Sequence, residues 1–337
     1  MNAPLLNDEA IAAATSLRVR TIGTSDLMRG RIDHLSSAIE RPVMTKGAAI
    51  QGAALAKGFP LVHAVGKGAA EGPRLLDIRW NQRSKGPKVT LVGKGVCFDT
   101  GGLDIKPDAA MLLMKKDMGG AATALAAASM IMQEGLDLRL RIILPIVENS
   151  VSATAFRPGD VYMSRAGVSV EIGNTDAEGR LILADALSLA DEDEPDLLFD
   201  FATLTGAARV ALGPDLPAMF CGDDALAQEI AGAGEAVNDP VWRLPLWAPY
   251  DGLIEGKTAD LNNVSGGSFG GAIVAALFLQ RFVKKSRAAW AHFDVYNWSQ
   301  SAKPGRPEGG EIQVARLVFE LLRHRVAGGR LAARRKT

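Results

Sequence analysis

Two short glycine-rich stretches of the sequence hold residues whose types could support metal chemistry. One stretch, 91–120, reads LVGKGVCFDTGGLDIKPDAAMLLMKKDMGG, and the other, 173–181, reads GNTDAEGRL. Carboxylates that meet in space bind divalent cations, and cationic side chains beside them can stabilise an anion. The two stretches together therefore predict a dinuclear metal site bound by carboxylates. The residues concerned are Lys94, Asp99, Lys106, Asp117, Asp176, Glu178 and Arg180.

Histidine and cysteine offer no alternative set of metal ligands. Cys97 and Cys221 lie far apart along the chain, and no cluster of histidine and cysteine residues occurs in the sequence. His292 lies in an apolar run and is expected to be a core residue. A metal site must therefore use oxygen ligands, with a neutral lysine amine as a further option. Such sites suit Mn²⁺ and Mg²⁺, and Zn²⁺ also accepts carboxylates.

The second stretch has two interpretations. Asp176, Glu178 and Arg180 alternate, so in an extended loop their side chains point the same way. Thr175 and Glu178 also fit a capping box that opens a helix over 181–189. The glycines of the first stretch match neither GxxxxGK[ST] nor GxGxxG, which disfavours a nucleotide-binding loop.

Apolar runs alternate with helical segments through most of the chain. This order predicts an α/β fold, a three-layer α/β/α sandwich with a mixed, mostly parallel central sheet. Ligands in such sheets bind outside the carboxyl ends of the strands, where Lys94 and Asp99 would fall. The expected strands are 88–93, 138–147, 197–201, 217–221 and 290–296, and the expected helices are 120–134, 181–189, 225–237 and 272–283.

Composition limits the class of protein. The 337 residues include 38 Lys plus Arg and 38 Asp plus Glu, and this neutrality disfavours a uniformly basic face for nucleic acid. No run approaches the roughly 18 apolar residues of a membrane span. The start lacks a basic segment followed by an apolar one, so we expect a cytoplasmic protein without a membrane partner. We leave 1–58 unassigned and interpret 326–337 as a basic tail.

Four motifs resemble one family of enzymes. NTDAEGRL at 174–181 matches the signature of the leucyl aminopeptidases, the cytosol aminopeptidases of peptidase family M17. Three further motifs precede it and match the family in the same order. They are the GKGxxFDxGG loop that includes 94–102, IKP at 105–107 and MxxDMGGAA at 114–122. The resemblance extends from about residue 59 to about residue 322, and it implies a dinuclear metallo-aminopeptidase catalytic domain over 59–325.

The resemblance implies a role for each residue that matches a motif. Lys94, through a neutral amine, Asp99, Asp117 and Glu178 would hold one metal ion. Asp99, Asp176 and Glu178 would hold a second. Lys106 would stay charged and stabilise the tetrahedral intermediate. Arg180 would hold a bicarbonate ion that takes the proton from the water bridging the metals.

The resemblance also implies a pocket for the first residue of a peptide substrate. Met114, Thr203 and Gly206 stand where the family lines this pocket. The opposite wall is usually a stretch of small residues, but this sequence has Tyr296 and Trp298 there. These aromatic side chains either narrow the pocket or pack at a contact between subunits, so a preference for leucine does not follow.

The resemblance also implies an assembly and an activity. Members of the family form homo-hexamers largely through their catalytic domains, and they carry an additional N-terminal domain for which 1–58 is too short. The leading hypothesis is an aminopeptidase with two divalent ions (Mn²⁺ or Zn²⁺, with Mg²⁺ as an option) and bicarbonate. A narrow dipeptidase acting on Cys-Gly-like substrates and a non-catalytic scaffold are the alternatives.

Overall fold

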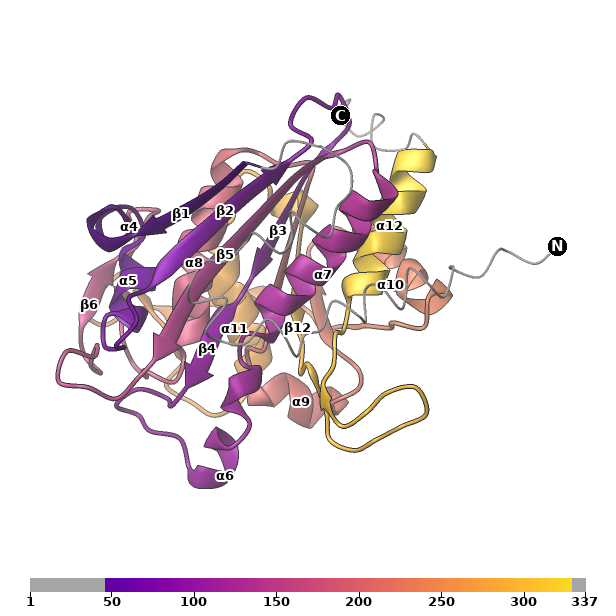
Figure 1. Ribbon diagram of the computed structural model, residues 1–337. Coiled ribbons are helices and arrows are strands. Elements are labelled where there is room, and N and C mark those ends of the chain that lie inside the picture. The colour runs from indigo at the N-terminus through magenta and orange to yellow at the C-terminus, as the bar shows by residue number, and fades with distance from the viewer. Residues whose placement is uncertain (1–45, 329–337) are drawn as a thin grey trace.

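The computed structural model describes residues 46–328, and a nine-stranded sheet crosses the centre of this part of the chain (Figure 1). The strands, in sheet order, are β1 (Lys46–Gln51), β2 (Arg74–Trp80), β5 (Arg139–Asn149), β3 (Lys88–Gly93), β8 (Leu197–Ala202), β12 (Trp290–Asp294), β9 (Ala218–Cys221) and β10 (Trp242–Arg243), while β4 (Gly95–Asp99) pairs with β5.

The centre of the sheet is parallel and its flanks contain antiparallel pairs. Strands β5, β3, β8 and β12 run parallel to one another, and β4 is parallel to β5. The pairs β1–β2, β2–β5 and β12–β9 are antiparallel. The mixed, mostly parallel sheet expected from the sequence is thus confirmed.

Helices cover both faces of the sheet and complete three layers. On one face α7 (Gly119–Glu134), α10 (Asp224–Ala236) and α12 (Ala315–Ala327) share a hydrophobic core with the sheet. The second core, on the other face, contains α5 (Pro60–Gly66), α8 (Glu178–Glu192) and α11 (Gly271–Gln280). Each central strand therefore buries both faces, which explains its nearly continuous apolar sequence.

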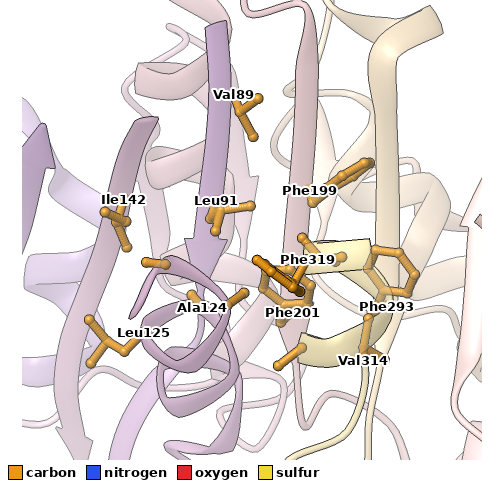
Figure 2. Packing of buried hydrophobic residues seen from close by; sticks show 14 of the residues in the cluster. Val89, Leu91, Ala124, Leu125, Ile142, Phe199, Phe201, Phe293, Val314 and Phe319 are labelled. Carbon is orange, nitrogen blue, oxygen red and sulfur yellow. The ribbon is translucent and has the colours of Figure 1, made fainter. Parts of the chain in front are cut away.

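The first core combines large rings on the sheet with small residues on α7 (Figure 2). The rings of Phe201 and Phe293 stack with centroids 5.5 Å apart, and Phe199 meets Phe293 edge-on. Alanines and glycines let α7 approach the sheet closely. A Cβ atom at Gly120 would lie 2.1 Å from the carbonyl oxygen of Phe201, so this approach requires glycine.

Several elements differ from the sequence-based expectation. Strand β1 pairs along its whole length with β2, and α4 (Gly52–Gly58) packs on α5. The folded unit therefore begins before residue 59, and residues 1–45 of the unassigned segment lie outside the described residues. Of the expected basic tail, α12 includes the first two residues, and 329–337 also lie outside the described residues.

Asp185 on α8 fixes the first turn of α5. Its buried carboxylate accepts hydrogen bonds from the backbone N–H groups of Leu61 at 2.8 Å, Val62 at 3.3 Å and Arg165 at 2.8 Å. Since Asp185→Ala would leave three N–H groups unpaired, we expect it to lower the free energy of unfolding by about 3 kcal/mol. Denaturant unfolding followed by circular dichroism measures this loss. Asp185→Asn keeps one oxygen acceptor and should lose less, so equal losses in both variants would contradict this role.

Candidate metal centre and substrate cavity

The structure brings the carboxylates of both glycine-rich stretches together at the carboxyl edge of the sheet. Lys94 follows β3, and Asp99 is the last residue of β4. Asp117 follows the short helix η1 (Met114–Lys116), and Glu178 is the first residue of α8. Near the arrowhead of β4 lies the short helix α6 (Asp108–Met111) (Figure 1).

Three carboxylates meet closely enough to share a cation. Asp99, Asp176 and Glu178 each offer one oxygen, and these three oxygens lie within 4.8 Å of one another. Asp117 joins the cluster through Lys94, whose Nζ lies 2.9 Å from Asp117 Oδ2 and 2.8 Å from Glu178 Oε1. The fourth carboxylate thus lies on the Lys94 side of the cluster.

Lys94 is buried between the two sides of this site. Its Nζ also donates to the carbonyl oxygen of Thr203 at 2.9 Å. A Cβ atom at Gly179 would lie 2.7 Å from this Nζ, so glycine at the start of α8 leaves room for the lysine. Burial alone would lower the pKa of Lys94, but the carboxylates of Asp117, Glu178 and Asp99 outweigh burial and raise it.

Lys106 approaches the carboxylates from the other direction. Its Nζ lies 2.9 Å from Asp99 Oδ2 and forms a second ion pair with Asp176 Oδ1. Burial would lower the pKa of Lys106, but Asp99, Glu178 and Asp176 raise it, so the side chain carries its charge at neutral pH.

The donor set fits divalent ions. Glu178 has only 1% exposure, and among residues 46–328 its Oε2 has no hydrogen-bond partner, while its Oε1 faces only the ammonium group of Lys94. The same holds for Asp117 Oδ2 and Asp176 Oδ1, which face the lysines only as ion-pair partners. Burial and the charge of Asp99 raise the pKa of Glu178 to about 8. Divalent ions would relieve this crowding of buried negative charge, and carboxylate oxygens are the ligands that hard divalent ions prefer.

The loop before α8 differs from both interpretations of its sequence. Because α8 starts at Glu178, Glu178 and Arg180 follow helical geometry and do not alternate with Asp176 along an extended chain. Thr175 does not cap the helix either. Its Oγ1 donates to the carbonyl oxygen of Gly101 at 2.6 Å and accepts from the N–H of Asp104 at 2.8 Å. The hydroxyl therefore joins the two glycine-rich stretches, a tertiary contact that replaces the expected cap.

Arg180 lies close to the centre but does not line the cavity described below. Its guanidinium is buried and Nη1 donates to the carbonyl oxygen of Asn263 at 2.6 Å. Nε has no hydrogen-bond partner among the described residues, and burial lowers the pKa of Arg180 to about 10. A buried guanidinium with an unused N–H suits a small anion.

His292 is a core residue, as expected. The ring is completely buried, and Nδ1 lies 2.6 Å from Asp200 Oδ1. The other oxygen of Asp200 accepts a hydrogen bond from Trp290 Nε1 at 2.7 Å.

A cavity of about 500 Å³ adjoins the carboxylates, a size that suits a small ligand. Its walls include four of the residues expected in the first-residue pocket: Met114, Thr203, Gly206 and Tyr296. Trp298 does not line this cavity, because its ring lies half-buried beneath Lys115, whose Nζ is 5.4 Å from the ring centroid. The expected narrowing by two aromatic residues is therefore limited to Tyr296.

Two cationic residues of the cavity wall were not among the expected site residues. They are Lys116 in η1 and Arg209 in α9 (Gly206–Leu212). Burial lowers the pKa of Lys116 to about 8. Both face Tyr296, with Lys116 Nζ 4.6 Å and Arg209 Cζ 5.2 Å from the centroid of its ring. Lys116 lies within a recognised motif at a position that the motif leaves open, so no spacing rule could reveal it.

Comparison with known proteins assigns the class. The model of the cytosol aminopeptidase family, catalytic domain, matches residues 31–318. The chain therefore belongs to the cytosol aminopeptidase family, as the motifs indicated.

Individual relatives agree with this assignment. The chain is 46% identical over 250 residues to a probable cytosol aminopeptidase of Chlamydia trachomatis, which covers 73% of this chain and 50% of the relative. It is 45% identical to a probable cytosol aminopeptidase of Xylella fastidiosa, with coverage of 76% and 52%. The chain thus spans about half the length of the curated relatives it matches.

Solved structures share the fold. The crystal structure of cytosol aminopeptidase from Coxiella burnetii superposes with a TM-score of 0.85 at 49% identity, covering 91% of this chain and 66% of that one. The bottromycin maturation enzyme BotP in complex with Mn gives a TM-score of 0.85 at 38% identity, covering 94% and 70%. Within residues 46–328, we find no helix with the length and apolarity needed to cross a membrane.

Proposed function

We propose that this chain is a metal-dependent aminopeptidase that hydrolyses the N-terminal bond of peptides. The observation that carries the proposal is the cluster of carboxylates whose oxygen atoms lie within 4.8 Å of one another, beside a cavity of about 500 Å³. The family to which the chain belongs supports the same activity. One of its solved relatives, BotP, was obtained in complex with Mn.

The two ligand sets implied by the family fit the arrangement of the side chains. Asp99, Asp176 and Glu178 would hold one ion, and their oxygen atoms already lie within 4.8 Å of one another. Lys94 with Asp117, Asp99 and Glu178 would hold the other. Two divalent ions at these positions would supply an acidified water and polarise the scissile carbonyl. Because the carboxylates raise the pKa of Lys94, its amine can bind a metal only after the ions offset that effect.

Lys106 and Arg180 would act on charge that develops during hydrolysis. Lys106 is charged and next to Asp99 and Asp176, and this position supports a role in stabilising an oxyanion. The buried guanidinium of Arg180, with Nε unpartnered, would hold bicarbonate as the proton acceptor. We further propose a homo-hexamer in the cytoplasm, as the family resemblance implies.

Hydrolysis of aminoacyl-4-nitroanilides tests the activity. The protein is stripped of metal, and Mn²⁺, Zn²⁺ or Mg²⁺ is returned in separate reactions. We expect cleavage only after metal is restored, and no cleavage of the same substrates with an acetylated α-amine. Equal rates with and without metal would refute the proposal. Cleavage limited to free dipeptides would support the narrow dipeptidase.

A further inference from the structure

The cavity beside the metal centre carries positive charge that the proposed reaction does not use. Lys116 and Arg209 line its wall, and neither forms an ion pair within residues 46–328. Lys116 is half-buried, whereas Arg209 is exposed. Both cations face the same ring, that of Tyr296, which is itself buried. Two positive charges therefore lie beside the ring of Tyr296 in the cavity wall.

The acidic residues nearest to these cations are engaged elsewhere. Asp117 pairs with Lys94 and accepts a hydrogen bond from Thr203 Oγ1 at 2.6 Å. Asp294 accepts hydrogen bonds at both oxygens, from Thr205 Oγ1 at 2.6 Å and from two backbone N–H groups. Neither carboxylate is free to turn toward the cations. Contact with an aromatic face stabilises a cation only modestly, so the pair retains the capacity to bind an anion.

Lys116 and Arg209 lie in the pocket that is expected to hold the first residue of the substrate. Lys116 belongs to the same short segment as Met114, and Arg209 lies one helical turn after Gly206 on α9. These two neighbours line the same cavity together with Tyr296. A side chain that enters the cavity would therefore meet both cations.

We propose that Lys116 and Arg209 select peptides whose first residue is acidic, by binding the carboxylate of an N-terminal aspartate or glutamate. A carboxylate matches this site better than a neutral side chain, because it offsets two like charges that have no counter-ion in the described residues. Charge-assisted hydrogen bonds from lysine and arginine are also stronger than neutral ones. The inference rests on the proposed aminopeptidase function and specifies its substrate class.

The test compares two substrates that differ only in charge. The metal-loaded chain of 337 residues is assayed with glutamyl- and glutaminyl-4-nitroanilide, and with the leucyl compound as a reference. We expect kcat/KM for glutamyl to exceed that for glutaminyl by about tenfold or more. The ratio should fall to about one in the double variant Lys116→Met with Arg209→Met. Lys116→Arg should retain most of it.

The neighbouring lysine provides a matched control. Lys115 is adjacent in sequence and also contacts an aromatic ring, that of Trp298, but it does not line the cavity. Lys115→Met should therefore leave the glutamyl-to-glutaminyl ratio unchanged. Circular dichroism and the metal content of each variant confirm that fold and centre are intact.

The outcomes separate this inference from the proposed function. If leucyl substrate is cleaved but the ratio is one or lower, or is unaffected by the double variant, the acidic preference is wrong and the aminopeptidase stands. A preference for Leu-Gly over Leu-Gly amide, without preference for glutamyl substrate, would assign the cations to the carboxyl end of a dipeptide and would also overturn the acidic preference.

If nothing is cleaved, calorimetric titration with free glutamate and glutamine tests whether the cations bind a carboxylate. Tighter binding of glutamate that the double variant loses supports the site, and equal binding refutes it.

Discussion

Replacing Glu178 by alanine is expected to abolish hydrolysis and to remove bound metal in the same variant. Glu178 is buried at the start of α8, and its oxygens contribute to both proposed ligand sets. Its removal also leaves Lys94 with one carboxylate partner fewer. We expect at least a thousandfold loss of kcat/KM, on the order of 4 kcal/mol or more, together with a lower metal content measured by mass spectrometry of the purified protein.

An exposed glutamate serves as the control for this variant. Glu235 lies on α10 with its side chain in solvent, so Glu235→Ala should keep both metal and activity. Glu178→Gln tests charge separately from shape, because it keeps the size of the side chain and one oxygen. Full activity in Glu178→Ala, in folded protein, would remove Glu178 from the centre.

The second large effect is expected from Lys106→Ala. We propose that its ammonium group stabilises the oxyanion, a role typically worth about 10²–10³ in rate, or about 3–4 kcal/mol. The loss should appear in kcat more than in KM. Metal content should be retained, because the positive charge of Lys106 lies beside Asp99 and Asp176 and opposes a cation there.

Steady-state kinetics with metal analysis on the same preparation distinguishes this role from others. If Lys106→Ala loses its metal, the lysine maintains the ligands and does not act on the intermediate. Lys106→Arg retains charge but changes its geometry, so partial recovery of kcat is expected. An unchanged kcat in the alanine variant would end the assignment.

The central strands could be predicted because their environment leaves a strong trace in the sequence. Strands β3, β8 and β12 lie between two layers of helices, and burial on both faces selects continuous apolar residues. Strand β2, RLLDIRW, mixes charged and apolar residues and was missed. The short strand β4 was missed as well, because its five residues, GVCFD, resemble a loop between glycines.

The residues of the candidate site likewise include some that the sequence predicts and some that only the structure reveals. Residues in recognised motifs, such as Asp99 and Glu178, could be named in advance, and the fold brings them together. Thr175 could not be placed, because its local sequence fits a helix cap equally well and only the contact with Gly101 decides. Lys116 and Arg209 meet only in the folded chain, at the ring of Tyr296 and the cavity wall, and contacts between distant segments leave no spacing to detect. Trp298 shows the converse, because its position two residues after Tyr296 in the sequence does not bring it to the cavity wall.

Titration of the metal-stripped protein with Mn²⁺ tests the central claim most directly. Calorimetry gives the number of ions bound per chain, and electron paramagnetic resonance reports whether the ions interact magnetically. We expect two ions per chain that interact, with hydrolysis appearing as they bind, and loss of this binding in Glu178→Ala. Binding of no ion, or of a single ion that restores full hydrolysis, would contradict a dinuclear centre built from these carboxylates.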